Sequence, residues 1–292
     1  MRIFITGHSG FVGSNFVSKS EDQHEFIKYF RGDVLCINSK VVLHFAGKAH
    51  DLKNSSSFDD YKLNNTVLTK EVFDAFLNSD AEVFITLSSV KAVADQVESQ
   101  LTEDDIPSPN TFYGRSKFLA EEYILSKKLI GKRIYILRPC LIHGPGNKGN
   151  LNLLYKFVSK RIPWPLGAFN NQRSYCSIEN LIFIINELII RNDIPSGVYN
   201  VADDTTLSTN EVIHIISESL NIKPKIWNFP RIIIKVLAHL GSIFHLPLTS
   251  ERLVKLTESY VVSNKKILSA LNKPLPVSSK NGLLKTFHSF AK

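Results

Sequence analysis

Residues 1–13, MRIFITGHSGFVG, decide the fold of this chain. The apolar run ends at a glycine, as a buried parallel strand does, and a helical pattern follows from Phe11 to about Lys19. Glycines between a strand and a helix let the backbone turn tightly and approach a pyrophosphate, which the helix N-terminus stabilises. The stretch therefore predicts a dinucleotide site. Its candidate residues are Gly7, Ser9, Gly10, Phe11, Val12 and Gly13.

Strand and helix patterns alternate along the chain up to about residue 145. HEFIKYF, KVVLHFAG, AEVFITLSS and KRIYILRPCLI have the composition of buried strands, and helical patterns cover 59–79 and 111–130. This alternation predicts an α/β fold of the Rossmann type, a doubly wound parallel sheet with helices on both faces. Ligands then lie at the carboxyl ends of the strands.

Loops, prolines and irregular helices become frequent after about residue 145, which indicates a second, smaller unit. We predict a nucleotide-binding domain made of residues 1–145 and about 172–202. An interleaved C-terminal substrate lobe would hold residues of about 146–171 and 203–292.

The composition narrows the ligand class. The chain has 292 residues, 43% of them hydrophobic, and its 35 basic and 27 acidic residues give 35 − 27 = +8. This excess favours anionic ligands, and because the basic residues are scattered we expect small phosphorylated molecules rather than nucleic acid. Three cysteines without CxxC or Cys/His spacing predict neither disulfides nor a metal site, and they favour the reducing cytoplasm.

Two apolar stretches, LIFIINELII at 181–190 and RIIIKVLAHLGSIFHL at 231–246, are too short or too interrupted by polar residues to span a bilayer. The second stretch is basic and amphipathic. We expect it to form a helix that packs over a substrate cleft, and loose contact with a membrane surface is the alternative.

Residues 111–117, TFYGRSK, set a tyrosine and a lysine one helical turn apart. A free tyrosine has a pKa of about 10, and a nearby ammonium together with a positively charged nicotinamide ring would lower it. Tyr113 is then a candidate acid and base that exchanges a proton with a sugar hydroxyl or ketone as hydride moves. Ser89, at the end of a predicted strand, would hold the same oxygen, and Lys117 would anchor the nicotinamide ribose.

The motifs GHSGFVG, HFAG, Ser89 and YGRSK together resemble the extended short-chain dehydrogenase/reductases, and within them the NAD-dependent epimerase/dehydratase family of nucleotide-sugar enzymes. The resemblance covers essentially the whole chain. It implies NAD(P) as cofactor and a homodimer that pairs through two helices, here KEVFDAFLNS and SKFLAEEYILSKKL. It also implies further cofactor contacts, from Phe45, Ala46, Gly47, Lys48, Asn65, Tyr113, Lys117, Pro139 and Cys140.

The C-terminal half carries segments similar to those of UDP-sugar enzymes, so the resemblance implies a UDP-sugar substrate. NKGNL, RIPWPLG and NQRSY match segments that hold the diphosphate, line the uracil pocket and supply a phosphate-clamping arginine. A guanidinium fork suits a diphosphate, and the alternative for Arg173 is a surface arginine at a strand edge. The implied substrate contacts are Ser88, Ser89, Asn150, Leu151, Trp164, Pro165 and Arg173.

The chain departs from the family between its second and fourth strands, where EFIKYFRGDVLCINSKVVLHFAG is compressed. The second helix looks nearly deleted and the third strand reduced. Where an acidic residue would favour NAD, the chain has Lys28 and Arg31. A basic residue suits a 2′-phosphate, so Arg31 favours NADP; the alternative is an exposed Arg31 beside a solvated ribose.

Ser89 is followed by Val90 and Lys91 rather than by the acidic residue of dehydrating family members, which disfavours a 4,6-dehydratase. The resemblance then implies a 4-epimerase or a 4-keto reductase that acts at C4 of a UDP-(N-acetyl)hexosamine in bacterial surface polysaccharide synthesis. Two further alternatives stay open. One is a non-catalytic NADP(H)-sensing or scaffold protein on the same fold, and the other is a membrane-surface enzyme for a lipid-linked sugar.

Overall fold

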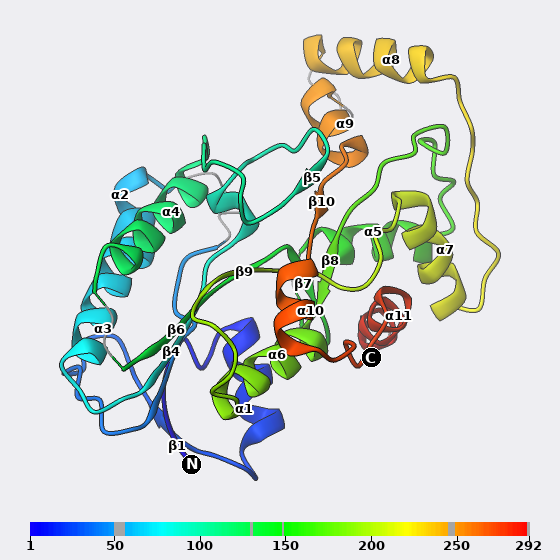
Figure 1. Cartoon of the computed structure of the whole chain (residues 1–292). Helices are drawn as coiled ribbons and strands as arrows, with labels where there is room; N and C mark the ends of the chain where they lie inside the picture. The colour runs from blue at the N-terminus through cyan, green and yellow to red at the C-terminus, as the bar shows by residue number, and fades with distance from the viewer. Residues whose placement is uncertain (50–55, 129–130, 148, 245–248, 291–292) are drawn as a thin grey trace.

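Six parallel strands form the central sheet of the computed structural model (Figure 1). The structure describes residues 1–49, 56–128, 131–147, 149–244 and 249–290. Most strands are runs of buried apolar residues, the pattern expected of strands covered on both faces. In sheet order they are β2 (Glu25–Lys28), β1 (Arg2–Thr6), β3 (Val41–His44), β4 (Val83–Leu87), β6 (Arg133–Pro139) and β9 (Gly197–Val201).

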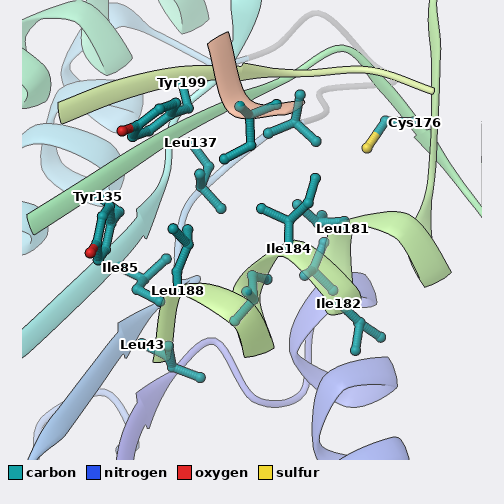
Figure 2. Packing of buried hydrophobic residues seen from close by; sticks show 14 of the residues in the cluster. Leu43, Ile85, Tyr135, Leu137, Cys176, Leu181, Ile182, Ile184, Leu188 and Tyr199 are labelled. Carbon is teal, nitrogen blue, oxygen red and sulfur yellow. The ribbon is translucent and has the colours of Figure 1, made fainter. Parts of the chain in front are cut away.

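Helices cover both faces of the sheet, which confirms the predicted α/β fold. Successive side chains of a strand point to opposite faces, so Ile3 of β1 joins one hydrophobic layer and Phe4 joins the other. Figure 2 shows the first layer, where Ile184 and Leu188 face strand residues such as Ile85. The first layer contains α1 (Phe11–Ser20) and α6 (Ile178–Ile190), and the second contains α3 (Leu68–Leu77) and α4 (Phe112–Leu125).

The connection between β2 and β3 is short, as the sequence predicts. Residues 29–40 contain neither a helix nor a strand. The second helix and third strand of the usual doubly wound order are therefore missing from this connection. β3 pairs with β1 on the side opposite to β2, so β2 is an edge strand followed by a mostly exposed loop.

The helix predicted over 59–79 is a continuous rod with a widened turn in its middle. α2 (Phe58–Tyr61) begins the rod, η1 (Lys62–Val67) is a π-helical turn, and α3 completes it. A capping box starts it: Asp60 N donates to Ser57 Oγ at 3.2 Å, and Ser57 N donates to the Asp60 carboxylate at 3.0 Å. π-helical turns are rare and frequently mark functional sites. This one contains Asn65, a predicted cofactor residue.

The C-terminal part of the chain builds a second hydrophobic core, in which five helices pack around Trp164 and Tyr175. These helices are α5 (Asn150–Ser159), α7 (Thr209–Ser219), α8 (Arg231–Ile243), α9 (Ser250–Thr257) and α11 (Ser279–Phe290). The remaining elements are η2 (Val90–Ala92), α10 (Lys265–Leu271) and two small parallel sheets, β5 (Gln100–Leu101) with β10 (Val261–Val262) and β7 (Leu141–His143) with β8 (Tyr175–Ser177). The division of the chain into two domains stays a prediction.

Within the described residues, no helix has both the length and the apolar character needed to cross a membrane. All three cysteines are free: Cys36 is exposed, and Cys140 and Cys176 are buried.

Candidate active site

The glycine-rich turn after β1 packs directly on the segment that follows β3. Gly7 has a φ of +69°, and a Cβ there would lie 2.4 Å from Ala46 N. A Cβ on Gly13 would lie 2.1 Å from the Gly7 carbonyl oxygen. No side chain fits in either place, so the backbone itself lines the turn at the start of α1. This cradle fits the pyrophosphate of a dinucleotide, whose charge the helix N-terminus stabilises.

We expect Gly13→Ala to weaken dinucleotide binding by at least about tenfold, because the new methyl group pushes the first turn of α1 away from Gly7. Titration of the protein with NADH and NADPH, followed by fluorescence, measures the effect. Gly149→Ala is the control, since Gly149 has an extended backbone with a φ of −172° and a Cβ there would meet only Asn147 Oδ1, at an ordinary 3.8 Å. Equal affinities for the two variants would contradict a close approach at Gly13.

A buried chain of hydrogen bonds connects this turn to the π-helical turn. Thr6 Oγ1 lies 2.8 Å from His44 Nδ1, and His44 Nε2 lies 2.9 Å from Thr69 Oγ1. The Thr69 hydroxyl donates to the Asn65 carbonyl, and Ala46 N donates to Thr6 Oγ1. These partners assign the proton of a neutral His44 to Nε2, with Nδ1 accepting from Thr6. Burial lowers the pKa of His44 to about 3, with a smaller contribution from the Lys117 charge.

His44 makes the stability of the fold depend on pH. Its pKa is about 3 in the folded chain and about 6.5 in the unfolded chain. Below pH 6.5, His44 binds a proton in the unfolded chain but stays neutral in the folded chain. The free energy of unfolding therefore has its full value above pH 6.5 and falls as the pH drops below it. The expected loss approaches about 1.4 kcal/mol per pH unit. Melting temperatures measured at several pH values should fall more steeply for the wild type than for His44→Gln; parallel curves would contradict this origin.

The phenol of Tyr113 meets Ser89 at the carboxyl end of β4. The Ser89 side chain is close enough to the phenol to lower its pKa, and Ser89 caps η2 by accepting from Lys91 N at 3.2 Å. Gly114 makes the approach possible, because a Cβ there would lie 2.3 Å from the Lys91 carbonyl oxygen. The first turn of α4 therefore packs against η2 and brings Tyr113 to Ser89, the pair predicted from the sequence.

The lowering of the Tyr113 pKa by Lys117 together with a positively charged nicotinamide ring stays a prediction, and the protein alone shifts this pKa in the other direction. Burial raises the pKa of Tyr113 above its ordinary value, the hydrogen bond from Ser89 acts against this, and Tyr61 adds a small further rise. The sequence shows the lysine one turn away but not the burial of the hydroxyl, which is the largest cause of the upward shift. Tyr113 consequently carries its proton at neutral pH.

Lys117 lies one turn beyond Tyr113, and its ammonium contacts the predicted cofactor segment. Nζ donates to the Leu87 carbonyl at 2.8 Å. A Cβ on Gly47 would lie 3.0 Å from the same nitrogen. Burial lowers the pKa of Lys117 to about 8, while the Glu121 carboxylate acts in the opposite direction. The lysine is placed to hold a hydroxyl-bearing group near Gly47 while its ammonium stays protonated, which is below about pH 8.

Asn65 joins three segments of the site from within the protein. Its Oδ1 accepts from Lys48 N at 2.7 Å, and its Nδ2 donates to Lys48 O at 3.0 Å and to Ser116 Oγ at 2.9 Å. Ser116 Oγ in turn donates to the Tyr113 carbonyl at 2.8 Å. The fully buried amide therefore positions Lys48 and α4. A direct contact of Asn65 with the cofactor stays a prediction.

The other cofactor candidates lie on three segments. Phe11, Val12 and the exposed Ser9 surround the start of α1. Phe45 follows β3, while Pro139 ends β6 and Cys140 comes directly after it. Burial raises the pKa of the Cys140 thiol, which keeps it protonated. Arg31 lies in the exposed loop after β2, and its guanidinium donates to the Asn64 side chain on the π-helical turn.

Several residues that the sequence reasoning missed hold this site in place. The Asp95 carboxylate accepts from Thr111 N at 2.9 Å and from Thr111 Oγ1 at 2.8 Å, and Thr111 caps α4. Behind the site, Arg138 of β6 and Glu121 of α4 form a buried bidentate ion pair, with nitrogen–oxygen distances of 2.6 to 3.1 Å. No local motif marks these residues, because each contact joins segments far apart in the sequence.

Among the substrate candidates, Ser88 and Ser89 point in opposite directions, as successive residues of an extended segment do. Ser88 lines a small, partly open pocket beside α4 together with Thr86, Lys117 and Glu121. Ser88 thus lies on the inner side of the site, away from the Tyr113 hydroxyl.

The guanidinium of Arg173 is held by hydrogen bonds within the protein. Its Nε donates to the Glu258 carbonyl at 3.1 Å, and the guanidinium also bonds the Lys255 carbonyl and the Glu258 carboxylate. These partners lie at the C-terminal end of α9. Burial lowers the pKa of Lys91, and the Arg173 charge contributes to the same shift, so Arg173 lies near the segment after Ser89.

The remaining substrate candidates belong to the C-terminal core. Asn150 and Leu151 begin α5, with Asn150 exposed and Leu151 buried. The Trp164 ring packs edge-on against Phe157, with centroids 5.8 Å apart, and half-buried Pro165 follows it. Their contact with a substrate stays a prediction.

Comparisons with known proteins place the chain in one family. The sequence profile of the NAD dependent epimerase/dehydratase family matches residues 32–202. The chain is 31% identical to a UDP-glucose 4-epimerase of Vibrio cholerae over 257 residues, 78% of either chain. It is 26% identical to the N-acetyl-alpha-D-glucosaminyl-diphospho-ditrans,octacis-undecaprenol 4-epimerase of Escherichia coli O157:H7, over 76% of this chain and 73% of the relative.

Solved structures share the fold. A UDP-glucuronic acid 4-epimerase from Bacillus cereus in complex with NAD superposes with a TM-score of 0.75 at 18% identity, covering 100% of this chain and 99% of that one. RMD from Pseudomonas aeruginosa, complexed with NADPH, superposes with a TM-score of 0.72 at 18% identity, covering 99% of this chain and 98% of that one. The chain is an NAD(P)-dependent enzyme that belongs to the NAD-dependent epimerase/dehydratase family.

Proposed function

We propose that this enzyme is a 4-epimerase that acts at C4 of a UDP-hexose or UDP-N-acetylhexosamine. One observation carries the proposal: the first turn of α4 packs on η2 and brings the Tyr113 hydroxyl to Ser89, just after β4, while Lys117 of the same helix binds the end of β4 at the Leu87 carbonyl. A phenol paired with a hydroxyl beside a nicotinamide site suits proton exchange with a secondary alcohol and its ketone. The similarity to a UDP-glucose 4-epimerase supports C4 as the reacting carbon.

In the proposed reaction, Tyr113 acts in its ionised form, which the positive charge of an oxidised nicotinamide ring would favour. The phenolate accepts the proton of the 4-hydroxyl and later returns it to the keto oxygen. Ser89 holds the same oxygen by a hydrogen bond and favours the ionised phenol, because it acts to lower the pKa of Tyr113. Lys117 and the backbone at Gly47 hold the nicotinamide ribose. The bound dinucleotide supplies hydride transfer at C4.

The substrate's diphosphate is proposed to bind at Arg173 and the start of α5. Arg173 is held at the end of α9 close to the segment after Ser89, which supports a position beside the sugar. A role in bacterial surface polysaccharide synthesis, a cytoplasmic location and a homodimer through α3 and α4 stay predictions.

A 4-keto reductase is the second candidate, and the protonation of Tyr113 favours it. Burial keeps the phenol protonated, the form that a reductase needs to deliver a proton to a ketone. An epimerase must also ionise the same group. A non-catalytic sensor of NADP(H) and a 4,6-dehydratase lack a supporting observation of this kind.

Native mass spectrometry and product analysis distinguish these functions. An epimerase is expected to be purified with a retained dinucleotide and to convert UDP-glucose or UDP-N-acetylglucosamine into its C4 epimer. A reductase is expected to exchange its dinucleotide and to consume NADPH with a 4-keto sugar. The mass of the bound cofactor also tests the preference for NADP predicted from Arg31. Binding of a dinucleotide with no turnover of any of these sugars would overturn the proposal.

A further inference from the structure

Helix α8 has an apolar face that the described part of the chain leaves uncovered. Ile234, Ala238 and Gly241 follow helical spacing and are buried, and the first two join the C-terminal core beside Leu253 of α9. Figure 1 shows α8 at one end of the molecule, beyond α9 and away from the sheet. A second set of large apolar side chains on α8 and its C-cap is exposed. It comprises Ile232, Ile233, Val236, Leu237, Leu240, Ile243 and Phe244, which we call the α8 apolar face.

The polar residues of α8 are all basic or neutral. Arg231, Lys235, His239 and Ser242 share the remaining stripe of the helix, and none is acidic. In the sequence, the stretch from 219 to 250 contains four lysines and arginines and no aspartate or glutamate. Two exposed aromatic residues, Trp227 and Phe229, come directly before the helix. The region therefore combines apolar, aromatic and positively charged surface.

The combination of apolar, aromatic and positively charged surface favours a membrane surface as the partner of this region. A helix with a wide apolar face and a basic polar stripe is typical of segments that lie in the interface of a bilayer. Positive charge is attracted to anionic headgroups, and tryptophan and phenylalanine partition near the headgroup level. α8 has 13 residues, or about 20 Å at 1.5 Å per residue, so it lies on a membrane rather than crossing the ~30 Å hydrocarbon core. The sequence-based expectation of a helix that packs over a substrate cleft does not account for this exposed face.

We propose that α8 seats this enzyme on an anionic membrane surface, with the α8 apolar face buried among the lipid headgroups and upper acyl chains. The end of α9 binds Arg173, so the α8–α9 pair is fastened to the body of the protein near the candidate active site. The inference is independent of which sugar the enzyme acts on, because it rests on the surface of α8 and of the segment before it.

Vesicle flotation with the full chain tests the proposal. Wild-type protein is expected to float with vesicles of equal parts phosphatidylcholine and phosphatidylglycerol, and much less with phosphatidylcholine alone. Ile232→Gln with Val236→Gln should lower the partition coefficient on anionic vesicles by at least about tenfold, since two aliphatic side chains no longer leave water. Lys235→Glu should lower it by at least about fivefold. Thermal melts check that each variant is folded.

The matched control is Ile106→Gln with Ile190→Gln. These isoleucines are 89% and 63% exposed, against 68% for Ile232, and neither is on α8. The control variant should float like the wild type. Wild-type protein that stays at the bottom of the gradient would overturn the proposal. So would a control variant whose partition coefficient on anionic vesicles falls as much as that of the α8 variant. A second copy of the chain would cover the α8 apolar face if two results came together. The wild type would not float, and the α8 variant without vesicles would have a lower molecular mass by light scattering than the wild type; this would also overturn the proposal.

Discussion

Tyr113→Phe is expected to fold normally and to lose about a thousandfold in turnover of the proposed UDP-sugar, because only the titratable hydroxyl is removed. The ring stays in the same packing against Tyr61, with centroids 6.2 Å apart. Dinucleotide affinity should change little, since Lys117 and the glycine-rich turn are intact. Steady-state kinetics, a thermal melt and a cofactor titration together measure the three expectations.

Tyr123→Phe is the matched control for this variant. Tyr123 lies on the same helix, and its hydroxyl donates to the Asp74 carboxylate at 2.7 Å, away from Ser89. We expect its activity to stay within a few-fold of the wild type. Turnover by Tyr113→Phe at the rate of this control would show that the Tyr113 proton takes no part in the reaction.

Glu121→Gln is expected to destabilise the fold by about 3–5 kcal/mol, because it leaves the buried Arg138 charge without its partner. The side chains of Glu121 and Arg138 are 2% and 5% exposed, so water cannot replace the lost contact. Both guanidinium contacts, from Nε and Nη2, end on this carboxylate. Chemical denaturation measures the loss in the free energy of unfolding, provided that its dependence on denaturant concentration has the same slope in both proteins.

The double variant Glu121→Leu with Arg138→Met should recover most of that stability. Removing both charges of a buried pair and filling the space with apolar groups is often neutral or stabilising. A double variant with as low a free energy of unfolding as Glu121→Gln would contradict this expectation. So would a Glu121→Gln protein whose free energy of unfolding lies within about 1 kcal/mol of the wild-type value, because an unpaired buried charge would then cost little.

The sequence predicts well those parts of the site that local pattern determines. The strand–turn–helix spacing of Gly7 and Gly13 is confirmed in the structure as a turn that no Cβ would fit. The helical spacing of Tyr113 and Lys117 and the position of Ser89 at a strand end are also confirmed. The missing helix between β2 and β3 was visible as a shortened segment.

What the sequence could not predict depends on contacts between distant segments. The fit of Gly114 against the Lys91 carbonyl and the hydrogen bonds of Asn65 to Lys48 arise only once helix and strand have packed. The upward shift of the Tyr113 pKa in the protein alone has the same origin, because burial is a property of the folded chain. The neutral state of His44 likewise follows from its enclosure between Thr6 and Thr69 rather than from its neighbours in sequence.

The most direct test of the proposed function follows deuterium at C4 of the substrate. The enzyme is incubated in ordinary water with UDP-glucose or UDP-N-acetylglucosamine carrying deuterium at C4, and the products are analysed by NMR. The account predicts a C4-inverted product that keeps its deuterium, because the hydride leaves and returns within one site while only the Tyr113 proton exchanges with solvent. An inverted product with solvent hydrogen at C4, or no inverted product from either sugar, would contradict it.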